Sequence, residues 1–422
     1  MHILWLKTEL LHPVDKGGRI RTYQMLRELK KLHRVTYLTL DDGTASEDAI
    51  SRAPEYCHEV IRVPFRTASK RSARFWAELA GNVVSRLPYA IAKYRVPALT
   101  EALRERVGRG DVDVVLCDFL SPSINVPSDL GVPIVLFQHN VEAAIWERHT
   151  QVASSPLKRA YMGEQWRRMR RFEGAECRRF DDVIAVSADD CRNLERAYGL
   201  DDVFEVPTGV DTDFFRPSGG VARNPQEMVF TGSMDWLPNE DGVTWFCDEI
   251  LPRIRRAIPE ATLRIVGRSP SRIVQDLAKK HAGVEVTGSV PDVRPHMERA
   301  GVFVIPLRIG GGTRLKVYEA MGMEIPIVST TIGAEGLPVR DGEELLLADT
   351  PDAFADATVR LIRDMALGAR IAQTAARRVR AEFGWREAAV RFAKICERGA
   401  ARHASERQPS PNLVDTRLNA SL

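Results

Sequence analysis

The sequence has few cysteines and lacks the close cysteine pairs that bind zinc. Its six cysteines stand singly, at Cys57, Cys117, Cys177, Cys191, Cys247 and Cys396. Disulfide frameworks and zinc sites use paired cysteines, so neither is expected, and a reducing cytoplasm fits best. Long apolar runs are also lacking: Lys7 and Glu9 follow HILWL at once, which excludes a signal peptide. Any contact with a membrane would therefore be peripheral.

An excess of charge of one sign is lacking too. The 422 residues include 60 Lys or Arg and 57 Asp or Glu, for a net charge of +3. This charge is too small to indicate nucleic acid as a partner. The length suffices for two domains, each with its own core.

Short apolar runs alternate with helical segments, which predicts two doubly wound α/β sheets. In the first half the runs are 2–6, 33–40, 113–118, 133–140 and 181–187, and in the second half they are 228–233, 261–268, 284–290, 301–307 and 325–331. We predict a Rossmann-like domain at 1–205, a Pro- and Gly-rich linker at 206–217 and a second Rossmann-like domain at 218–385. A helix at 386–400 is expected to return to the first domain, and 401–422 is expected to be disordered.

The segment GGGTRLKVYEAMG, residues 310–322, follows one of these strands and has the composition of an anion site. Glycines allow close approach of the backbone, and the helix that follows offers unpaired N–H groups. Arg314 and Lys316 place two cations there, and Glu319, one turn inside the helix, can accept from ribose hydroxyls. A flexible loop with solvated charges is the alternative. The GxxxxGK[ST] spacing of a P-loop is absent.

With six further segments in order, this one resembles the GT-B glycosyltransferases of glycosyltransferase family 4, among them bacterial exopolysaccharide-associated sugar transferases. The others are DKGGRIRTYQML, FQHNVEAAIWERH, VPTGVDTDFF, FTGSMDWLPNEDGVTWF, IVGRSP and VTGSVPDV. The resemblance extends to about residue 400. It implies that the domain at 1–205 binds the acceptor and that the domain at 218–385 binds the nucleotide sugar. It implies a retaining transferase that needs no cofactor or metal, uses a UDP- or GDP-linked sugar, and acts on a saccharide or lipid-linked acceptor. A nucleotide-sugar 2-epimerase and a non-catalytic binding module remain as alternatives.

The resemblance also assigns roles to residues. Of the family's usual pair of glutamates, Glu319 is present and Gly311 stands where the other would be. The backbone of Gly311, Gly312 and Thr313 would then contact the sugar, and Arg268, Arg314 and Lys316 the diphosphate. The further donor residues implied are Gly17, Gly18, Gly232, Ser233, Gly288 and Val290. Those implied on the acceptor side are Gly18, Arg21, His139 and Glu142, and those implied in catalysis are His139, Arg314, Lys316 and Glu319.

Two other features carry alternatives. Asp111 with Asp113, and Asp211 with Asp213, spell DxD, but we interpret both as local turn or strand-start residues rather than metal ligands. Residues 61–110 hold eleven Lys or Arg against three Glu, interleaved with aromatic side chains. This pattern suits the anionic face of a membrane on the cytoplasmic side. It equally suits a solvated helix pair whose aromatic side chains enter the core.

Overall fold

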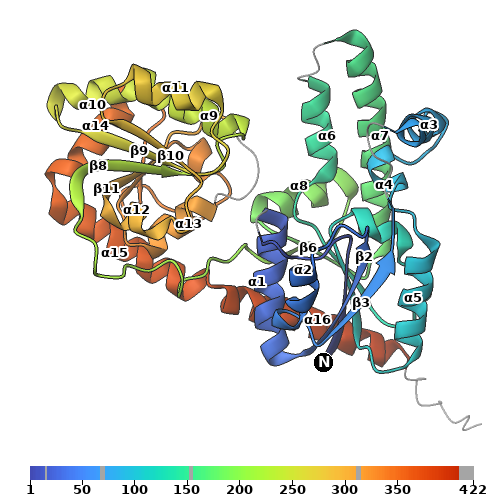
Figure 1. The fold of residues 1–422 in the computed structure, drawn as a ribbon. Coiled ribbons are helices and arrows are strands. Elements are labelled where there is room, and N and C mark those ends of the chain that lie inside the picture. The colour runs from blue at the N-terminus through green and yellow to red at the C-terminus, as the bar shows by residue number, and fades with distance from the viewer. Residues whose placement is uncertain (15–16, 67–71, 152–154, 310–314, 408–422) are drawn as a thin grey trace, which may run out of the picture. The chain divides into compact units, whose positions relative to one another are not determined.

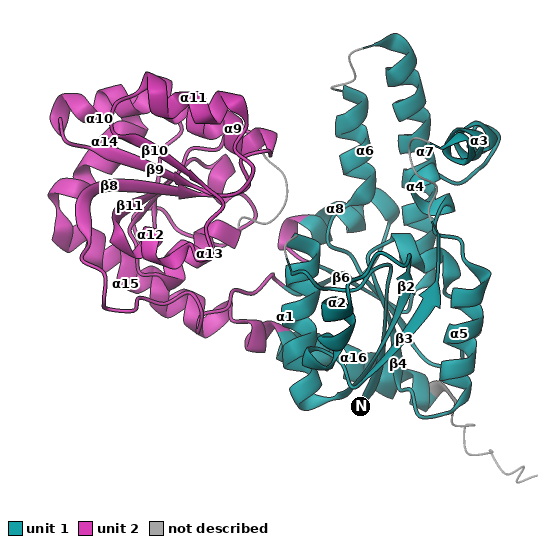
Figure 2. Ribbon diagram, viewed as in Figure 1, with its two compact units in different colours: residues 1–185, 190–206, 389–422 teal, residues 186–189, 207–388 magenta. Residues whose placement is uncertain are grey.

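The computed structural model describes residues 1–14, 17–66, 72–151, 155–309 and 315–407. The chain forms two compact units (Figure 2). Unit 1 comprises Met1–Ala185, Asp190–Val206 and Ala389–Leu422, and unit 2 comprises Val186–Asp189 and Pro207–Ala388. Each unit has its own apolar core, so each is described by itself.

Unit 1 is built on a parallel sheet of seven described strands, in the order β3-β2-β1-β4-β5-β6-β7 (Figure 1). The strands are β1 (His2–Lys7), β2 (Arg34–Asp41), β3 (Glu59–Pro64), β4 (Val114–Asp118), β5 (Ile134–Phe137), β6 (Asp182–Ala185) and β7 (Phe204–Glu205). The chain order reverses between β1 and β4, and such a switch point is where doubly wound sheets bind ligands.

Helices connect these strands. They are α1 (Gly17–Leu32), α2 (Glu47–Ser51), α3 (Ala73–Asn82), α4 (Tyr89–Ala92), α5 (Pro97–Gly108), α6 (Glu142–Gln151), α7 (Pro156–Arg179) and α8 (Ala188–Tyr198). Helices α6 and α7 project from the sheet as a pair, with α3 beside them (Figure 1). Strands β1 and β4 are buried along their whole length, which explains their unbroken apolar sequences.

Unit 2 has a second parallel sheet, with six described strands in the order β10-β9-β8-β11-β12-β13. The strands are β8 (Asn224–Thr231), β9 (Thr262–Val266), β10 (Val284–Gly288), β11 (Ala300–Ile305), β12 (Ile327–Ser329) and β13 (Leu346–Leu347). The helices are α9 (Leu237–Trp245), α10 (Leu251–Ala257), α11 (Arg272–Lys280), α12 (Arg294–Arg299), α13 (Leu315–Gly322), α14 (Pro351–Arg363) and α15 (Met365–Glu382). The predicted fold class, two doubly wound Rossmann-like sheets, is confirmed.

The last described helix, α16 (Trp385–Arg407), begins in unit 2 and ends in unit 1. Phe392 on this helix stacks on Trp5 of β1, with ring centroids 5.5 Å apart. Residues 401–407 continue the helix, so the prediction of a disordered tail from 401 is wrong there; 408–422 lie outside the described residues. Helix propensity in ARHASER and the preceding turns accounts for the extension.

All six cysteines are buried and unpaired. None of the helices in the described ranges is both long and apolar enough to cross a membrane.

Candidate active site

Three glycines bring the ends of adjacent strands in unit 2 close together. Gly232 follows β8, Gly267 follows β9 and Gly288 ends β10. The Gly232 N–H donates to the carbonyl of Val266 (3.0 Å), and the Gly267 N–H donates to Gly288 (3.2 Å). A Cβ on Gly267 would lie 1.7 Å from the carbonyl oxygen of Gly232, so only glycine fits there. We call Gly232, Gly267 and Gly288 the glycine floor, a surface without side chains at the ligand-binding edge of the sheet.

Lys316, on the first turn of α13, extends toward this floor. Its Nζ donates to Oδ1 of Asn239 (2.9 Å) and lies 4.0 Å from the ring centroid of Phe230. Asn239 in turn donates to the carbonyl of Ser233 (2.8 Å). A Cβ added to Gly232 would be 3.1 Å from the Lys316 Nζ. The structure therefore brings together three predicted donor residues, Gly232, Ser233 and Lys316.

Glu319 lies one turn further along α13. No described residue forms a hydrogen bond with its carboxyl group, although the side chain is only partly exposed. Burial raises the pKa of Glu319 to about 7, and the nearby charge of Lys316 opposes this rise. An ionised carboxyl group at this position can accept hydrogen bonds from hydroxyl groups, and the predicted contact of Glu319 with ribose hydroxyls stays a prediction.

The other predicted donor residues of unit 2 are placed less centrally. Arg268 is exposed, and its Nε donates to Oγ of Ser233 (3.0 Å), which donates to Asp235 (2.6 Å). Val290 packs partly against the core of unit 2. Gly311, Gly312, Thr313 and Arg314 lie outside the described residues, so their predicted contacts stay predictions.

In unit 1, a buried polar network occupies the ends of β1, β4 and β5, at the switch point of the sheet. Asp118 is fully buried and accepts from Lys7 (2.8 Å), Thr22 (2.6 Å) and Trp5 (3.1 Å) through Oδ2. Its Oδ1 lies 2.6 Å from Nε2 of His139. Burial alone would raise the pKa of Asp118. The charge of Lys7, followed by the contact with His139, outweighs burial and holds this pKa well below its usual range.

His139 is buried, and desolvation lowers its pKa to about 3, so its ring is neutral at physiological pH. A neutral ring bonded to ionised Asp118 carries its proton on Nε2, which leaves Nδ1 as an acceptor. Nδ1 is buried and has no partner within the described chain. The ring stacks on Phe119, with centroids 3.8 Å apart. The ring is therefore held in one orientation with one acceptor available.

The predicted residues of the first glycine loop lie against the same network. The backbone of Gly18 lies close to the ring of Phe119, since a Cβ on Gly18 would be 2.9 Å from that ring. Phe119 itself has a φ of +72°. A Cβ added to Gly17 would have no neighbouring atom within 4 Å. Arg21 is buried, and burial lowers its pKa to about 10 against the opposing charges of Asp118 and Asp190. Gly18, Arg21 and His139 are thus brought together.

Glu142 begins α6, three residues after His139. Its pKa is raised to about 7 by burial and by the neighbouring carboxyl of Glu173. Glu173, on α7, is fully buried and accepts from the N–H groups of Glu142 (2.8 Å) and Ala143 (3.0 Å). Tyr198 and Gln138 also donate to it. Glu173 therefore fixes the start of the helix that carries Glu142.

The sequence-based prediction missed Asp118, Lys7 and Phe119. The available signal was a charged residue at the end of a buried strand, since Asp118 closes VVLCD and Lys7 closes HILWLK. Two of the DxD aspartates have described partners nearby in sequence: Asp111 pairs with Arg106, and Asp211 accepts from the Phe214 N–H (3.0 Å). Over the described ranges, no group of three His, Cys, Asp or Glu side chains could hold a metal ion.

Comparison with known families shows which family the chain belongs to. A family model described as Glycosyltransferase Family 4 matches residues 16–214, and one described as Glycosyl transferases group 1 matches residues 225–364. The chain is a family 4 glycosyltransferase. The two matches lie mostly in unit 1 and unit 2 respectively. The predicted family and transferase activity are confirmed.

Similar proteins extend this result. The glycosyltransferase is 22% identical over 366 residues to an uncharacterized 44.6 kDa protein in the cps region of Klebsiella pneumoniae, covering 84% of this chain and 89% of the relative. Sucrose-phosphate synthase from Thermosynechococcus elongatus superimposes with a TM-score of 0.68 at 19% identity, covering 95% and 100% of the two chains. HepE from Anabaena, solved with UDP, gives 0.67 at 14% identity, with 94% and 100% covered. At these identities the structural likeness shows the GT-B fold alone.

Proposed function

We propose that this glycosyltransferase moves a sugar from a UDP- or GDP-linked donor to a hydroxyl acceptor, with retention of anomeric configuration and without a metal. The observation that carries the proposal is Lys316, whose ammonium group lies beside Gly232 at the strand ends of unit 2, with Glu319 one turn away. The UDP named in the HepE structure is of the same ligand class.

The donor diphosphate would lie on the glycine floor, where backbone approaches without side chains. Lys316 would meet the negative charge that grows on the diphosphate as the sugar leaves. Glu319 would accept from a ribose hydroxyl. Arg314 would add a second cation and the backbone of Gly311, Gly312 and Thr313 would contact the sugar. These cations make a metal unnecessary for charge neutralisation.

On the acceptor side, His139 would accept a hydroxyl hydrogen through Nδ1, while Asp118 holds its Nε2. Gly18 and Arg21 would line the same region, and Glu142 would position the acceptor. With glycine at position 311, no carboxylate stands at the family's usual sugar-contacting position, so we propose transfer without a covalent enzyme intermediate, with the acceptor hydroxyl attacking the face that the diphosphate leaves.

We further propose a role in exopolysaccharide or glycolipid synthesis at the cytoplasmic face of a membrane. The relative in a cps region supports the first part. Residues 61–110 support the second: Trp76, Val83 and Val84 are 61%, 63% and 90% exposed, with Arg74 and Arg86 close by in sequence. Phe75, in contrast, packs against Tyr89, so only part of the aromatic set is available to a membrane.

A donor panel and one charge substitution test the proposal. UDP- and GDP-sugars should raise the melting temperature. In the glycosidic product formed with the acceptor hydroxyl, the transferred sugar should keep the donor's anomeric configuration by proton NMR, with or without EDTA. Lys316→Met keeps the apolar stem on Phe230 and should lower kcat by about 10²–10³-fold. Lys279→Met, an exposed lysine of unit 2, is the control. A flat response to every donor, or full activity of Lys316→Met, would refute the site.

A further inference from the structure

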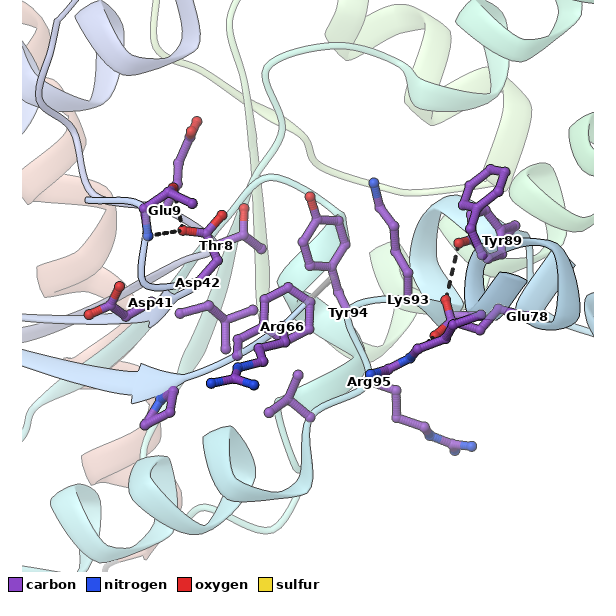
Figure 3. A pocket seen from close by; sticks show the side chains of 18 of the residues that line it. Thr8, Glu9, Asp41, Asp42, Arg66, Glu78, Tyr89, Lys93, Tyr94 and Arg95 are labelled. Carbon is purple, nitrogen blue, oxygen red and sulfur yellow. Dashed lines mark hydrogen bonds and ion pairs between the residues drawn. The ribbon is translucent and has the colours of Figure 1, made fainter. Parts of the chain in front are cut away.

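A cavity of about 1530 Å³ lies in unit 1, over the carboxyl ends of β1, β2 and β3 (Figure 3). Residues that follow or close these strands line part of it, and residues of α1 and α3 to α7, with the segments between them, line the rest. Pockets for drug-sized ligands usually measure about 300–1,000 Å³, so this cavity has room for several sugar rings. Neither the glycine floor nor the Asp118 network uses it.

One wall of the cavity is aromatic and basic. Tyr94 stacks on Phe65, with ring centroids 5.9 Å apart, and the Lys93 Nζ lies 4.7 Å from the centre of the Tyr94 ring. Figure 3 shows Lys93 and Tyr94 extending in the same direction. Arg66 follows Phe65, and Arg95 follows Tyr94. We call these five residues the Tyr94 wall.

The three cations of the Tyr94 wall lack carboxylate partners. Over the described ranges, Arg66, Lys93 and Arg95 form no ion pair, whereas Arg19 and Arg74 on other walls are paired with Glu9 and Glu78. Burial lowers the pKa of Lys93 without an opposing carboxylate. Unpaired cations beside a stacked aromatic face are suited to an anionic group on a ring-shaped ligand.

The wall at the strand ends is acidic instead. Asp42, just after β2, accepts from the hydroxyl and N–H of Thr44, and these hydrogen bonds lower its pKa, so it is ionised. Glu9 and Asp41 lie nearby (Figure 3). Carboxylates accept hydrogen bonds from sugar hydroxyls and repel anions. The two walls therefore differ in the ligand groups that they favour.

We propose that this cavity binds the acceptor, and that the acceptor is an oligosaccharide bearing an acidic group. The acidic group, a uronate or a phosphate monoester, contacts Lys93, Arg66 and Arg95, and hydroxyl groups contact Asp42 and Glu9. This inference rests on the proposed function. Strands β1 and β4 are parallel, with Leu6 paired to Cys117, so the cavity and the His139 site both lie at the carboxyl ends of the strands.

Matched ligands test the charge requirement. Cellotetraose, cellotetraose with one terminal glucuronate, and cellotetraose with one 6-phosphate would be titrated calorimetrically into the whole protein. At least one acidic form should bind about tenfold or more tightly than the neutral parent, and the double variant Lys93→Gln with Arg95→Gln should remove that difference. Arg272→Gln, at a highly exposed arginine of unit 2, is the matched control.

The two acidic ligands distinguish uronate from phosphate. Equal binding of all three ligands, no binding of either acidic form, or an unchanged preference in the double variant would overturn the inference. A double variant that loses binding only to phosphatidylglycerol vesicles would also overturn it, in favour of a lipid surface. UDP binding by the double variant should be unchanged. Failure of the donor panel with intact oligosaccharide binding would instead reject the proposed function alone.

Discussion

Glu319 and Glu142 are two carboxyl groups with a pKa near 7, but different surroundings raise them. Burial raises the pKa of Glu319, and the charge of Lys316 partly lowers it again. For Glu142 the carboxyl of Glu173 adds to the effect of burial. Each group changes charge near neutral pH, and each was predicted to contact a substrate. Donor contact through Glu319 should therefore depend on pH in the range where the enzyme works.

Substitution of Glu319 by glutamine tests this dependence. In the unfolded chain a glutamate ionises near pH 4.5, and in the folded protein Glu319 ionises near 7. Between these values the folded state holds the extra proton, so the free energy of unfolding falls as pH rises. Glu319→Gln should remove about 2–3 kcal/mol of that fall between pH 5 and 8, measured by urea denaturation.

Donor affinity provides the second readout for the same substitution. An ionised carboxylate accepts more strongly than a neutral acid, so UDP should bind the wild-type enzyme more tightly at pH 8 than at pH 6. Glu319→Gln should bind weakly at both values. Glu260→Gln, at an exposed position, should behave like wild type. If stability and affinity of Glu319→Gln track wild type across this range, Glu319 has neither role.

Single residues of the site were predictable where a motif marked them and not where only the fold brought them together. Lys316 and Glu319 follow a glycine-rich run, and the structure brings Lys316 to Gly232. Asn239, which holds Lys316, is 77 residues away in sequence. It lies within FTGSMDWLPNEDGVTWF, but nothing in that segment indicates a contact with Lys316. Asp118 likewise reaches His139 only because β4 and β5 pair. Partners of this kind depend on strand order, which periodicity does not report.

Among the elements, most strands were predicted because buried parallel strands are continuous apolar runs. The edge strand β3 was missed, since EVIRVP mixes charged and apolar residues and is only partly buried. The helical segment after β8 is not uniform, since α9 and α10 are joined by a π-helical turn at Phe246–Ile250. Helices α14 and α15 are separated only by Asp364, whose side chain accepts from the Leu367 N–H (2.9 Å) and caps the start of α15. Boundaries set by such local bonds are weakly encoded in periodicity.

Helix α6 depends on one buried carboxyl group from α7. Glu173 accepts from two N–H groups at the start of α6 and from Tyr198 and Gln138. Glu173→Gln presents an amide NH₂ to these donors, so it should lower the free energy of unfolding by about 2–4 kcal/mol. Urea denaturation measures this loss. Glu164→Gln on the same helix, where the carboxyl is partly solvent-exposed, should cost below about 1 kcal/mol. Equal losses in both variants would contradict the capping role.

At the scale of the whole molecule, the two sheets share one architecture but have different residues at the carboxyl ends of their strands. In unit 2 the strand ends carry the glycine floor, and in unit 1 they carry the buried Asp118 network. Backbone without side chains suits a diphosphate, whereas a fixed neutral imidazole suits a hydroxyl group. This division agrees with the separate roles that a transferase needs for donor and acceptor.

Helix α16 carries the chain from unit 2 into unit 1, and Phe392 on this helix packs in the core of unit 1. Phe392 is fully buried, with its ring 5.5 Å from that of Trp5 and 5.1 Å from that of Phe137. Phe392→Ala should therefore destabilise unit 1 by about 3–5 kcal/mol. Hydrogen exchange read by mass spectrometry should show faster exchange in β1 and β5 and unchanged exchange in β8 and β11. Val390→Ala, at a 37% exposed position of the same helix, should change neither sheet. Faster exchange in both sheets of Phe392→Ala would mean that the units unfold as one, and slower or unchanged exchange in β1 would show that α16 does not stabilise unit 1.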